Sequence, residues 1–395
     1  MDIVKLKDLT VDGKGTYGVA APAVEYQENL PTYLRITDIL DDGTLNLSEL
    51  KSVKVPDSER YMLRPNDIVF ARTGGSTGRN YFYDGTDGAF VYAGFLIKFS
   101  LDPKKVNPKF IKYFCQSEQY KQWVRSFNTG STRGNINAQT FGNMEIALPG
   151  RKQQDHLVSI LESIGKKIKL NKKINDNLQQ QVMALFRKMF VDTNNDNRHE
   201  CRADEYFDIS IGKTPPRKEP QWFSINPVDC VWVSISDMGS CGLYIADSSE
   251  YLTHESIERF NVKIVPDNTV ILSFKLTVGR VAITDGDMTT NEAIAHFKTD
   301  KTEINEYLYC YLKEFNYQAM GSTSSIATAV NSKIIKAMPF IVPANDELVE
   351  FHAFAAPMFA MIKANQKENV RLTELRDSLL SRLMSGELDV SDIQL

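Results

Sequence analysis

The residues from Arg151 to Phe190 carry an apolar stripe with the spacing of a coiled coil. Seam positions alternate four and three residues apart, and they are apolar at both ends of the stretch and polar in its middle. The seam consists of Leu157, Leu161, Ile164, Ile168, Asn171, Asn175, Leu178, Val182, Leu185 and Met189. A helix of this length extends for roughly 50 Å. Its apolar face therefore needs a partner along most of that distance.

A second copy of the seam follows 194 residues later. It consists of Phe351, Ala355, Met358, Ile362, Asn365, Asn369, Leu372, Arg376, Leu379 and Leu383. Both copies place two asparagines at the middle, where a polar seam residue lowers stability but fixes the register. The sequence predicts that the two helices pair and bury these polar layers together. The central position of the layer allows parallel and antiparallel pairing alike.

The segments between the helices also repeat. Gly78-Arg79 recurs as Gly279-Arg280, and Asp84-Gly85 recurs as Asp285-Gly286. One internal duplication therefore gives the order domain, helix, domain, helix. The predicted boundaries are 1–150 and 191–343 for two mixed α/β domains, 151–190 for the central helix, and 344–395 for the C-terminal helix and tail.

This order favours antiparallel pairing. The first helix ends at the second domain, so the second helix must run back towards the first domain if the two pair along their length. We therefore predict an α+β protein with a globular domain at each end of an antiparallel coiled coil, related by a pseudo-twofold axis. Pro357 stands where the first helix has Ser163, and it should kink the second helix or mark where its regular part begins.

Composition indicates a globular cytoplasmic protein. The five cysteines form no CxxC pair, which favours reduced thiols. The longest apolar run, Ala353–Ile362, is too short to cross a membrane. The net charge of −4 combines a basic first long helix with an acidic second half of the chain. An acidic total does not favour nucleic-acid binding, but the local charge decides that question.

Motifs for catalysis or cofactors are weak. Gly13–Gly18 fits GxGxxG, but Pro22 interrupts the helix that a dinucleotide site requires, so a turn is predicted there. The five histidines show no metal-binding spacing, and no P-loop sequence occurs. The Asn/Asp-Pro-Pro-aromatic motif of adenine methyltransferases is missing, since Val228 follows Asn226-Pro227. We predict no catalytic residue, no metal and no cofactor.

The whole chain resembles the specificity subunit of type I restriction–modification enzymes. The resemblance rests on Leu148-Pro149 before the first long helix, on Gly212–Pro215 and Trp232–Asp237, and most specifically on Asn369–Leu388. It implies two target-recognition domains that each read half of a bipartite site in double-stranded DNA. It also implies that the helices are spacers, docking two adenine-methylating modification subunits that restriction subunits join. The first domain lacks the GlyXThrPro motif of Gly212–Pro215, so the two half-sites should differ.

Polar loops of both domains are the candidate DNA-binding sites, because base edges and phosphates are read by donors, acceptors and cations on exposed loops. In the first domain the candidates are Arg72, Thr73, Ser76, Thr77, Arg79, Ser131, Thr132, Arg133, Asn135 and Asn137. In the second they are Ser273, Lys275, Thr277, Arg280, Ser322, Thr323, Ser324, Ser325 and Asn331. The alternative is that these loops are solvated turns, or that Arg79 pairs with Asp84 and Arg280 with Asp285.

Apolar residues off the seam are the candidate docking positions for modification subunits; they include Ile160, Ile174 and Phe186. Two other functions stay open. A scaffold that joins proteins through its coiled coil would show no salt-dependent DNA binding. A hydrolase or transferase with a dispersed active site would be active without any partner.

Overall fold

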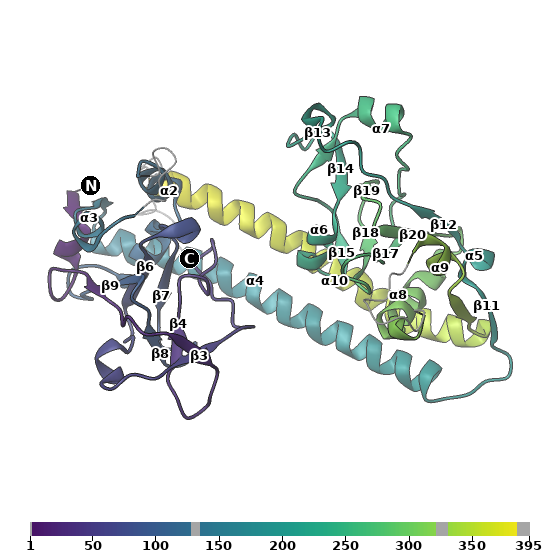
Figure 1. Ribbon diagram of the computed structural model, residues 1–395, viewed down its shortest axis with the longest axis horizontal. Coiled ribbons are helices and arrows are strands. Elements are labelled where there is room, and N and C mark those ends of the chain that lie inside the picture. The colour runs from purple at the N-terminus through teal and green to yellow at the C-terminus, as the bar shows by residue number, and fades with distance from the viewer. Residues whose placement is uncertain (1, 128–134, 321–330, 385–395) are drawn as a thin grey trace. The chain divides into compact units, whose positions relative to one another are not determined.

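The computed structural model describes residues 2–127, 135–320 and 331–384. It divides into two compact units (Figure 1). Unit 1 comprises the residues up to Ile168 and those from Arg371 onward, and unit 2 comprises Lys169–Val370. Each long helix therefore contributes to both units.

Unit 1 contains two four-stranded sheets and a separate two-stranded ladder. One sheet has the order β2 (Thr16–Tyr17), β9 (Leu96–Ser100), β6 (Asp67–Ala71), β7 (Asn80–Tyr83). The other has the order β3 (Ala23–Glu25), β5 (Lys51–Val53), β4 (Thr32–Leu34), β8 (Phe90–Tyr92), with β4 and β8 parallel. The ladder pairs β1 (Asp2–Lys5) with β10 (Glu145–Leu148).

Unit 2 repeats this plan strand by strand. Its first sheet has the order β12 (Asp208–Ile211), β20 (Ile294–Lys298), β17 (Val270–Ser273), β18 (Val281–Thr284), β15 (Tyr244–Ile245). Its second has the order β13 (Phe223–Ser224), β16 (Tyr251–Leu252), β14 (Cys230–Val233), β19 (Thr289–Thr290), again with one parallel pair. The ladder is β11 (His199–Arg202) with β21 (Pro339–Val342). The predicted α+β class and internal repeat are confirmed, and β15 is the one addition among the described strands.

The alternation of side chains along the central strands explains this layering. In unit 2, Val270 and Leu272 join the apolar cluster that includes the long helices, whereas Ile271 faces the cluster below the second sheet. Figure 1 accordingly shows β17, β18 and β20 between α10 and the layer that holds β13 and β14. Unit 1 follows the same rule, with Ile68 facing the helices and Val69 facing the second sheet.

The two long helices are α4 (Arg151–Phe186) and α10 (Asn345–Met384). A π-helical turn, η4 (Arg187–Val191), follows α4. The shorter α-helices are α1 (Pro108–Phe114), α2 (Glu118–Arg125), α3 (Ala138–Gly142), α5 (Ala203–Tyr206), α6 (Ile235–Ser240), α7 (His254–Phe260), α8 (Asn305–Glu314) and α9 (Ser332–Lys336). The 3-10 turns are η1 (Leu6–Leu9), η2 (Ser58–Tyr61), η3 (Gly74–Ser76), η5 (Pro220–Trp222), η6 (Thr302–Ile304) and η7 (Tyr317–Met320).

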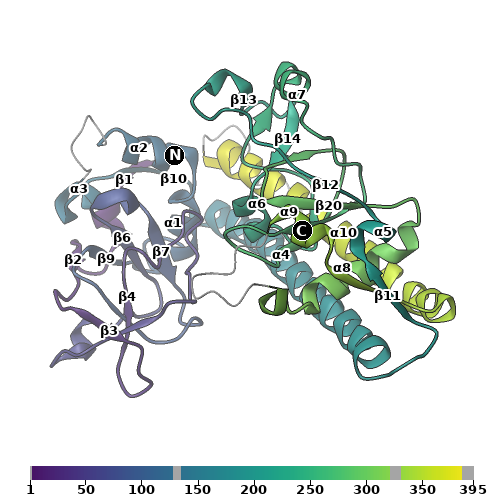
Figure 2. The same ribbon diagram turned by 45° about the vertical axis from the view of Figure 1, so that its right-hand side comes forward.

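In unit 2 the long helices pair through the predicted asparagine layer. The Asn171 amide donates to Asn369 Oδ1 at 3.0 Å, and the Asn365 amide donates to Asn175 Oδ1 at 2.8 Å. Residue numbers rise along α4 as they fall along α10, so the helices run antiparallel here, side by side in both views (Figure 2). Ile362 lies below the layer in the apolar cluster of the unit, and Leu178 and Met358 pack against it.

In unit 1 the other ends of the helices share one core. Leu157 and Leu161 are buried in the cluster that contains Leu380, and Leu379 packs against it. Ile164 is also buried. Ile168 and Leu372 are half-buried on the same helices, while the side chain of Leu383 lies outside the described part.

Some sequence expectations were wrong. Phe186 is buried among Tyr307 and Phe351 of its own unit, so it is not a docking residue. Of the two roles considered for Pro357, marking where the regular helix begins is excluded, because α10 already begins at Asn345; a kink at Pro357 stays a prediction. The apolar stretch after residue 90 forms the two strands β8 and β9, because a turn at which the Leu96 amide donates to the Ala93 carbonyl separates them.

Candidate nucleic-acid interface

The loop between β6 and β7 in unit 1 is held as a tight hairpin. Ala71 donates to Arg79 and Gly78 donates to Ala71, with N···O distances of 2.8 and 2.9 Å. Gly74 and Gly78 have φ values of +78° and +87°, a region that glycine enters without steric cost. The Thr77 hydroxyl donates to the Gly74 carbonyl at 2.7 Å. Thr73 and Ser76 are half-exposed on the same loop.

The structure brings the two predicted loops of unit 1 together. The Ile136 amide donates to the Arg72 carbonyl at 2.9 Å, and Thr73 forms an antiparallel bridge with Asn135. Asn137 follows, and its side chain caps α3 by accepting from the Thr140 amide. Ser131, Thr132 and Arg133 of this loop lie outside the described residues.

Arg72 is the cation at this junction. Its guanidinium lies 5.1 Å from the centre of the Tyr17 ring, and its Nε is buried without a hydrogen-bond partner. Tyr17 is 43% exposed, so an aromatic surface lies beside the cation. A cation over an exposed aromatic ring, where the two polar loops meet, is suited to an acceptor from outside the chain.

Arg79 has a different role. Its Nε and one terminal nitrogen donate to the Asp41 carboxylate at 2.7 and 3.1 Å, and the other terminal nitrogen donates to the Ile39 carbonyl. The pairing with Asp84 considered from the sequence is therefore replaced by a pairing with Asp41. Arg79 connects the hairpin to the loop after β4.

The matching loop of unit 2 connects β17 and β18. Ser273 is fully buried, and its hydroxyl donates to the Thr277 carbonyl at 2.6 Å. Lys275 and Thr277 are exposed. The Arg280 guanidinium donates to the Ile235 carbonyl at 2.5 Å and packs against Gly239. Lys275 and Thr277 are thus the predicted side chains of this loop that reach solvent.

Asp285 pairs with the second long helix. Its carboxylate lies 2.9 Å from Lys363 and 3.1 Å from Lys367 on α10. Burial pushes the pKa of Asp285 upward, but the two lysines outweigh burial and hold it below its ordinary value. The considered pairing of Arg280 with Asp285 is therefore replaced by these contacts.

Asn331 occupies the position of Asn137 in the repeat. Its side chain caps α9 by accepting from the Lys333 and Ile334 amides at 2.9 and 3.1 Å. Both asparagines thus start the short helix that leads to the ladder strand. Ser322, Thr323, Ser324 and Ser325 lie outside the described residues.

Gly212, the first residue of the Gly212–Pro215 motif, packs so closely that no side chain fits there. The sequence alone did not identify this requirement. A Cβ atom on Gly212 would lie 2.2 Å from the Asn291 carbonyl oxygen, and one on Gly18 would lie 2.3 Å from the Ala93 carbonyl oxygen. Gly18 is therefore the unit 1 equivalent of Gly212, although no Thr-Pro follows it. Gly18 is also the last glycine of the GxGxxG match at 13–18, a pattern that is typical of dinucleotide sites. Strand β2 occupies part of that motif, where a turn was predicted, and the next element along the chain is another strand, β3, and not the helix that a dinucleotide site requires.

The residues after Gly212 build a second polar cluster. The Arg217 guanidinium lies 4.1 and 4.5 Å from the ring centres of Phe223 and Trp232. It also makes two hydrogen bonds to Glu250. Because these contacts satisfy the guanidinium, Arg217 orders the segment instead of offering a free cation.

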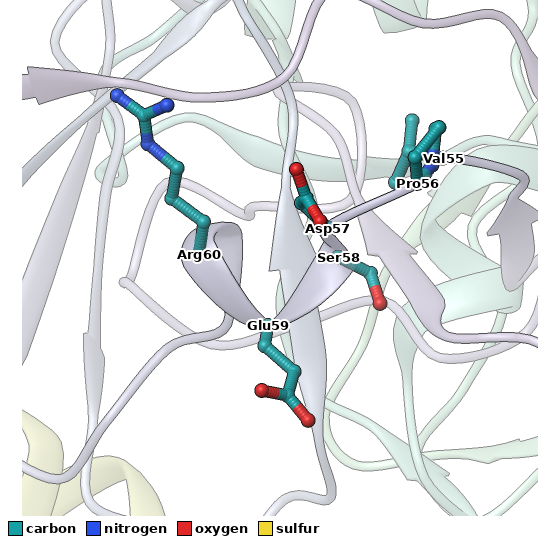
Figure 3. Close-up of a pocket in the computed structure, with 6 residues that line it drawn as sticks. All are labelled: Val55, Pro56, Asp57, Ser58, Glu59 and Arg60. Carbon is teal, nitrogen blue, oxygen red and sulfur yellow. The ribbon is translucent and has the colours of Figure 1, made fainter.

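A hollow in unit 1 lies outside the two predicted loops. Figure 3 shows a hollow lined by the continuous segment Val55–Arg60, where the Glu59 carboxylate and the Arg60 guanidinium point to opposite sides. Among the described residues, no group of three His, Cys, Asp or Glu side chains is placed to hold a metal ion. No helix of that part of the chain is both long and apolar enough to span a membrane.

The fold and the loops define a duplicated recognition protein, with two like scaffolds that present different polar hairpins. The family model of the type I restriction modification DNA specificity domain matches residues 3–180 and again 197–373. The chain therefore belongs to the type I restriction–modification specificity family. It is a specificity subunit with two target-recognition domains.

Similar proteins agree with this assignment. The specificity subunit of the type I restriction enzyme HindI of Haemophilus influenzae is 21% identical, over 90% of this chain and 94% of that protein. The MjaIX specificity subunit of Methanocaldococcus jannaschii is 24% identical, over 72% of this chain and 70% of that protein. A crystal structure of a type I S subunit from M. genitalium has the same fold, with a TM-score of 0.54, 15% identity and coverage of 97% and 95% of the two chains.

Proposed function

We propose that each unit binds one half of a bipartite site in double-stranded DNA and that the chain directs adenine methylation of that site. One observation carries this proposal: the two units have the same strand order but different hairpin loops. A repeated scaffold supplies two reading surfaces. Different loops supply different base contacts, since sequence is read by side chains at base edges.

Methylome sequencing tests the proposal directly. A host that carries this gene with its modification partner should show N6-methyladenine within one bipartite motif, and deletion of the gene should remove that motif. A genome with the same methylated motifs in both strains would contradict the proposal.

In unit 1 we assign base contact to Arg72 and a supporting role to Arg79. The Arg72 guanidinium lies over the exposed ring of Tyr17 at the junction of the two loops, whereas Arg79 is engaged with Asp41. Arg72→Ala should weaken binding to one half-site by about 1–3 kcal/mol, the worth of a bidentate base contact. Arg79→Ala is the matched control. It should leave the preferred bases unchanged, and equal effects of both variants on every sequence would refute the assignment.

Exposed apolar residues of α10 are suited to dock modification subunits, two per chain because the chain is duplicated, with restriction subunits joining them. Val349, Phe354, Met361 and Val370 are 61%, 41%, 53% and 59% exposed. Phe354 and Met361 stand seven residues apart and share one face of the helix, and apolar side chains exposed together favour a protein partner. Ile160 and Ile174, which the sequence suggested, are half-buried and present less surface.

Mass measurement after co-expression tests the docking surface. Met361→Asp should reduce the amount of bound modification subunit. Leu47→Asp, a change at a 49% exposed residue of unit 1 outside the long helices, should not. Equal binding by both variants would remove α10 from the interface.

The rival function is a scaffold that joins proteins without reading DNA. DNA binding that weakens steeply with salt, with a preferred sequence, supports the specificity function. Binding that ignores both salt and sequence would favour the scaffold.

A further inference from the structure

The tip of the β17–β18 hairpin in unit 2 exposes an apolar side chain on an unfavourable backbone. Leu276 is 97% exposed, and its φ is +61°. A branched apolar residue rarely adopts a positive φ, since its Cβ crowds the backbone. Both features oppose the stability of the isolated chain.

Hydrogen bonds from the rest of the hairpin hold Leu276 in this conformation. The Thr277 amide donates to the Lys275 carbonyl at 2.7 Å, which closes a three-residue γ-turn around Leu276. The buried Ser273 hydroxyl donates to the Thr277 carbonyl at 2.6 Å and accepts from the Arg280 amide at 3.1 Å. The Gly279 amide also donates to the Ser273 carbonyl at 3.0 Å. The tip is therefore rigid, and it points a complete leucine side chain into solvent.

Unit 1 shows that the scaffold does not require this leucine. Its equivalent loop has Gly74 and Gly75 at the tip, and Gly74 adopts a φ of +78°. A Cβ on either glycine would meet no atom within 4 Å. Because glycine removes both the strain and the exposed apolar surface, a leucine held in strain points to a contact made outside the chain.

The shape of the tip identifies the kind of contact. Leu276 stands at the tip of the loop that joins two antiparallel strands of the five-stranded sheet, between exposed Lys275 and Thr277. The major groove of B-DNA is about 12 Å wide, so a protruding loop tip can enter it, and the apolar group presented there is the 5-methyl of thymine. A lysine beside the apolar residue is suited to a phosphate.

We propose that Leu276 reads a thymine methyl group in the half-site bound by unit 2, with Lys275 on the adjoining phosphate. This inference rests on the proposed function and names one specificity-determining contact within it. It also assigns unit 2 a contact that the glycine tip of unit 1 does not make.

The test uses the chain with its co-expressed modification subunit. Duplexes are first selected from a randomised pool, and Arg72→Ala marks the half-site of unit 1. Each thymine of the other half-site is then replaced singly by uracil, which removes only the methyl group. The parent should lose about three- to tenfold in affinity at one position, the value expected for one buried methyl. Leu276→Gly should bind the thymine and uracil duplexes equally.

Controls separate this contact from folding and from protein docking. Leu276→Gly should keep or raise the unfolding temperature, because glycine accepts a positive φ. Ile225→Ala, at an 89% exposed apolar residue on the loop between β13 and β14 of unit 2, should keep the preference for thymine. Equal affinity of the parent for every uracil duplex, or a thymine preference retained by Leu276→Gly, would overturn the proposal.

Two further outcomes distinguish failure of the Leu276 contact from failure of the proposed function. A half-site without an A·T pair, or loss of bound modification subunit in Leu276→Gly without any thymine preference in the parent, would overturn this inference alone. If the parent selects no sequence from the pool, the proposed function itself fails and the inference fails with it.

Discussion

Unit 1 ends its β6–β7 hairpin with Gly74 and Gly75, whereas unit 2 ends its β17–β18 hairpin with Lys275 and Leu276. Beneath the tips the two hairpins are alike, since Ala71 donates to Arg79 in one unit and Ser273 to Arg280 in the other. The strand orders also correspond in both pairs of sheets. Backbone hydrogen bonds and close contacts therefore fix the duplicated framework, whereas the residues at the hairpin tips differ between the units.

The largest expected difference between the units concerns an ion pair that unit 2 has and unit 1 lacks. Arg198 makes two hydrogen bonds to Glu347 at 2.8 and 2.6 Å, and also donates to the Phe190 and Thr193 carbonyls. This arginine thereby lowers the pKa of Glu347 to about 2. The repeat places Gln153 at the position of Glu347 in unit 1.

Arg198→Ala should therefore lower the stability of unit 2 by about 1.5–3 kcal/mol, because it removes charge-assisted hydrogen bonds to a partly buried carboxylate and to the Phe190 and Thr193 carbonyls. Hydrogen exchange followed by mass spectrometry would show the loss of protection in unit 2. A matched change, Arg151→Ala at a half-exposed pair of unit 1, should cost under about 1 kcal/mol. Equal losses from the two changes would contradict this account.

A second comparison should give equal results in the two units. Gly18→Ala and Gly212→Ala both force a Cβ against a carbonyl oxygen of the neighbouring strand segment. Each should lower the stability of its own unit by roughly 1–3 kcal/mol. Gly165→Ala is the control, since its Cβ would meet no atom within 4 Å and alanine favours the helix. A strong effect at one of the two positions only would show that they are not equivalent.

The smallest expected difference is a dependence on pH. His296 of β20 is buried, with Nδ1 2.9 Å from the Ser210 hydroxyl and Nε2 2.7 Å from the Thr290 hydroxyl. Burial, and to a smaller extent the charge of the nearby Lys298, lowers the pKa of His296 to about 3. The equivalent residue in unit 1 is Lys98, opposite Val69 as His296 is opposite Ile271.

A depressed histidine pKa gives stability that is complete above the unfolded pKa of about 6.5 and is lost as the pH falls towards 3. Unit 2 should therefore lose about 2 kcal/mol between pH 6.5 and pH 5, at about 1.4 kcal/mol per pH unit. Denaturant titrations at several pH values, compared between the parent and His296→Gln, would measure this. A profile that His296→Gln leaves unchanged would assign the acid sensitivity to other groups.

The sequence predicted the long helices and their polar layer because heptad spacing and paired asparagines depend only on residues within one helix. Asn171 and Asn369 meet as expected for antiparallel pairing. The duplication was also visible, since Gly78-Arg79 and Gly279-Arg280 recur in the same hairpin. These features are set by local periodicity or by backbone geometry, both of which leave a pattern in the residues.

The partners of individual charges were not predictable. Arg79 pairs with Asp41 and Asp285 pairs with two lysines of α10, across sequence separations that no local pattern records. The exposure of Leu276 was also missed, because the residue types of this loop do not show whether its leucine packs against the sheet or faces solvent. Its positive φ arises from hydrogen bonds to Ser273 and Arg280 that only the folded hairpin provides.

We expect the two units to read bases and the two long helices to set the gap between the half-sites. Removing one heptad from each long helix keeps the seams in phase and shortens the pair by roughly 10 Å, which corresponds to about three base pairs of B-DNA. Sites selected from random DNA by the parent and by this variant give the test. The account predicts the same bases within each half-site, together with a gap shortened by about three base pairs or loss of joint binding to the original gap. An unchanged gap with altered half-site bases would contradict it.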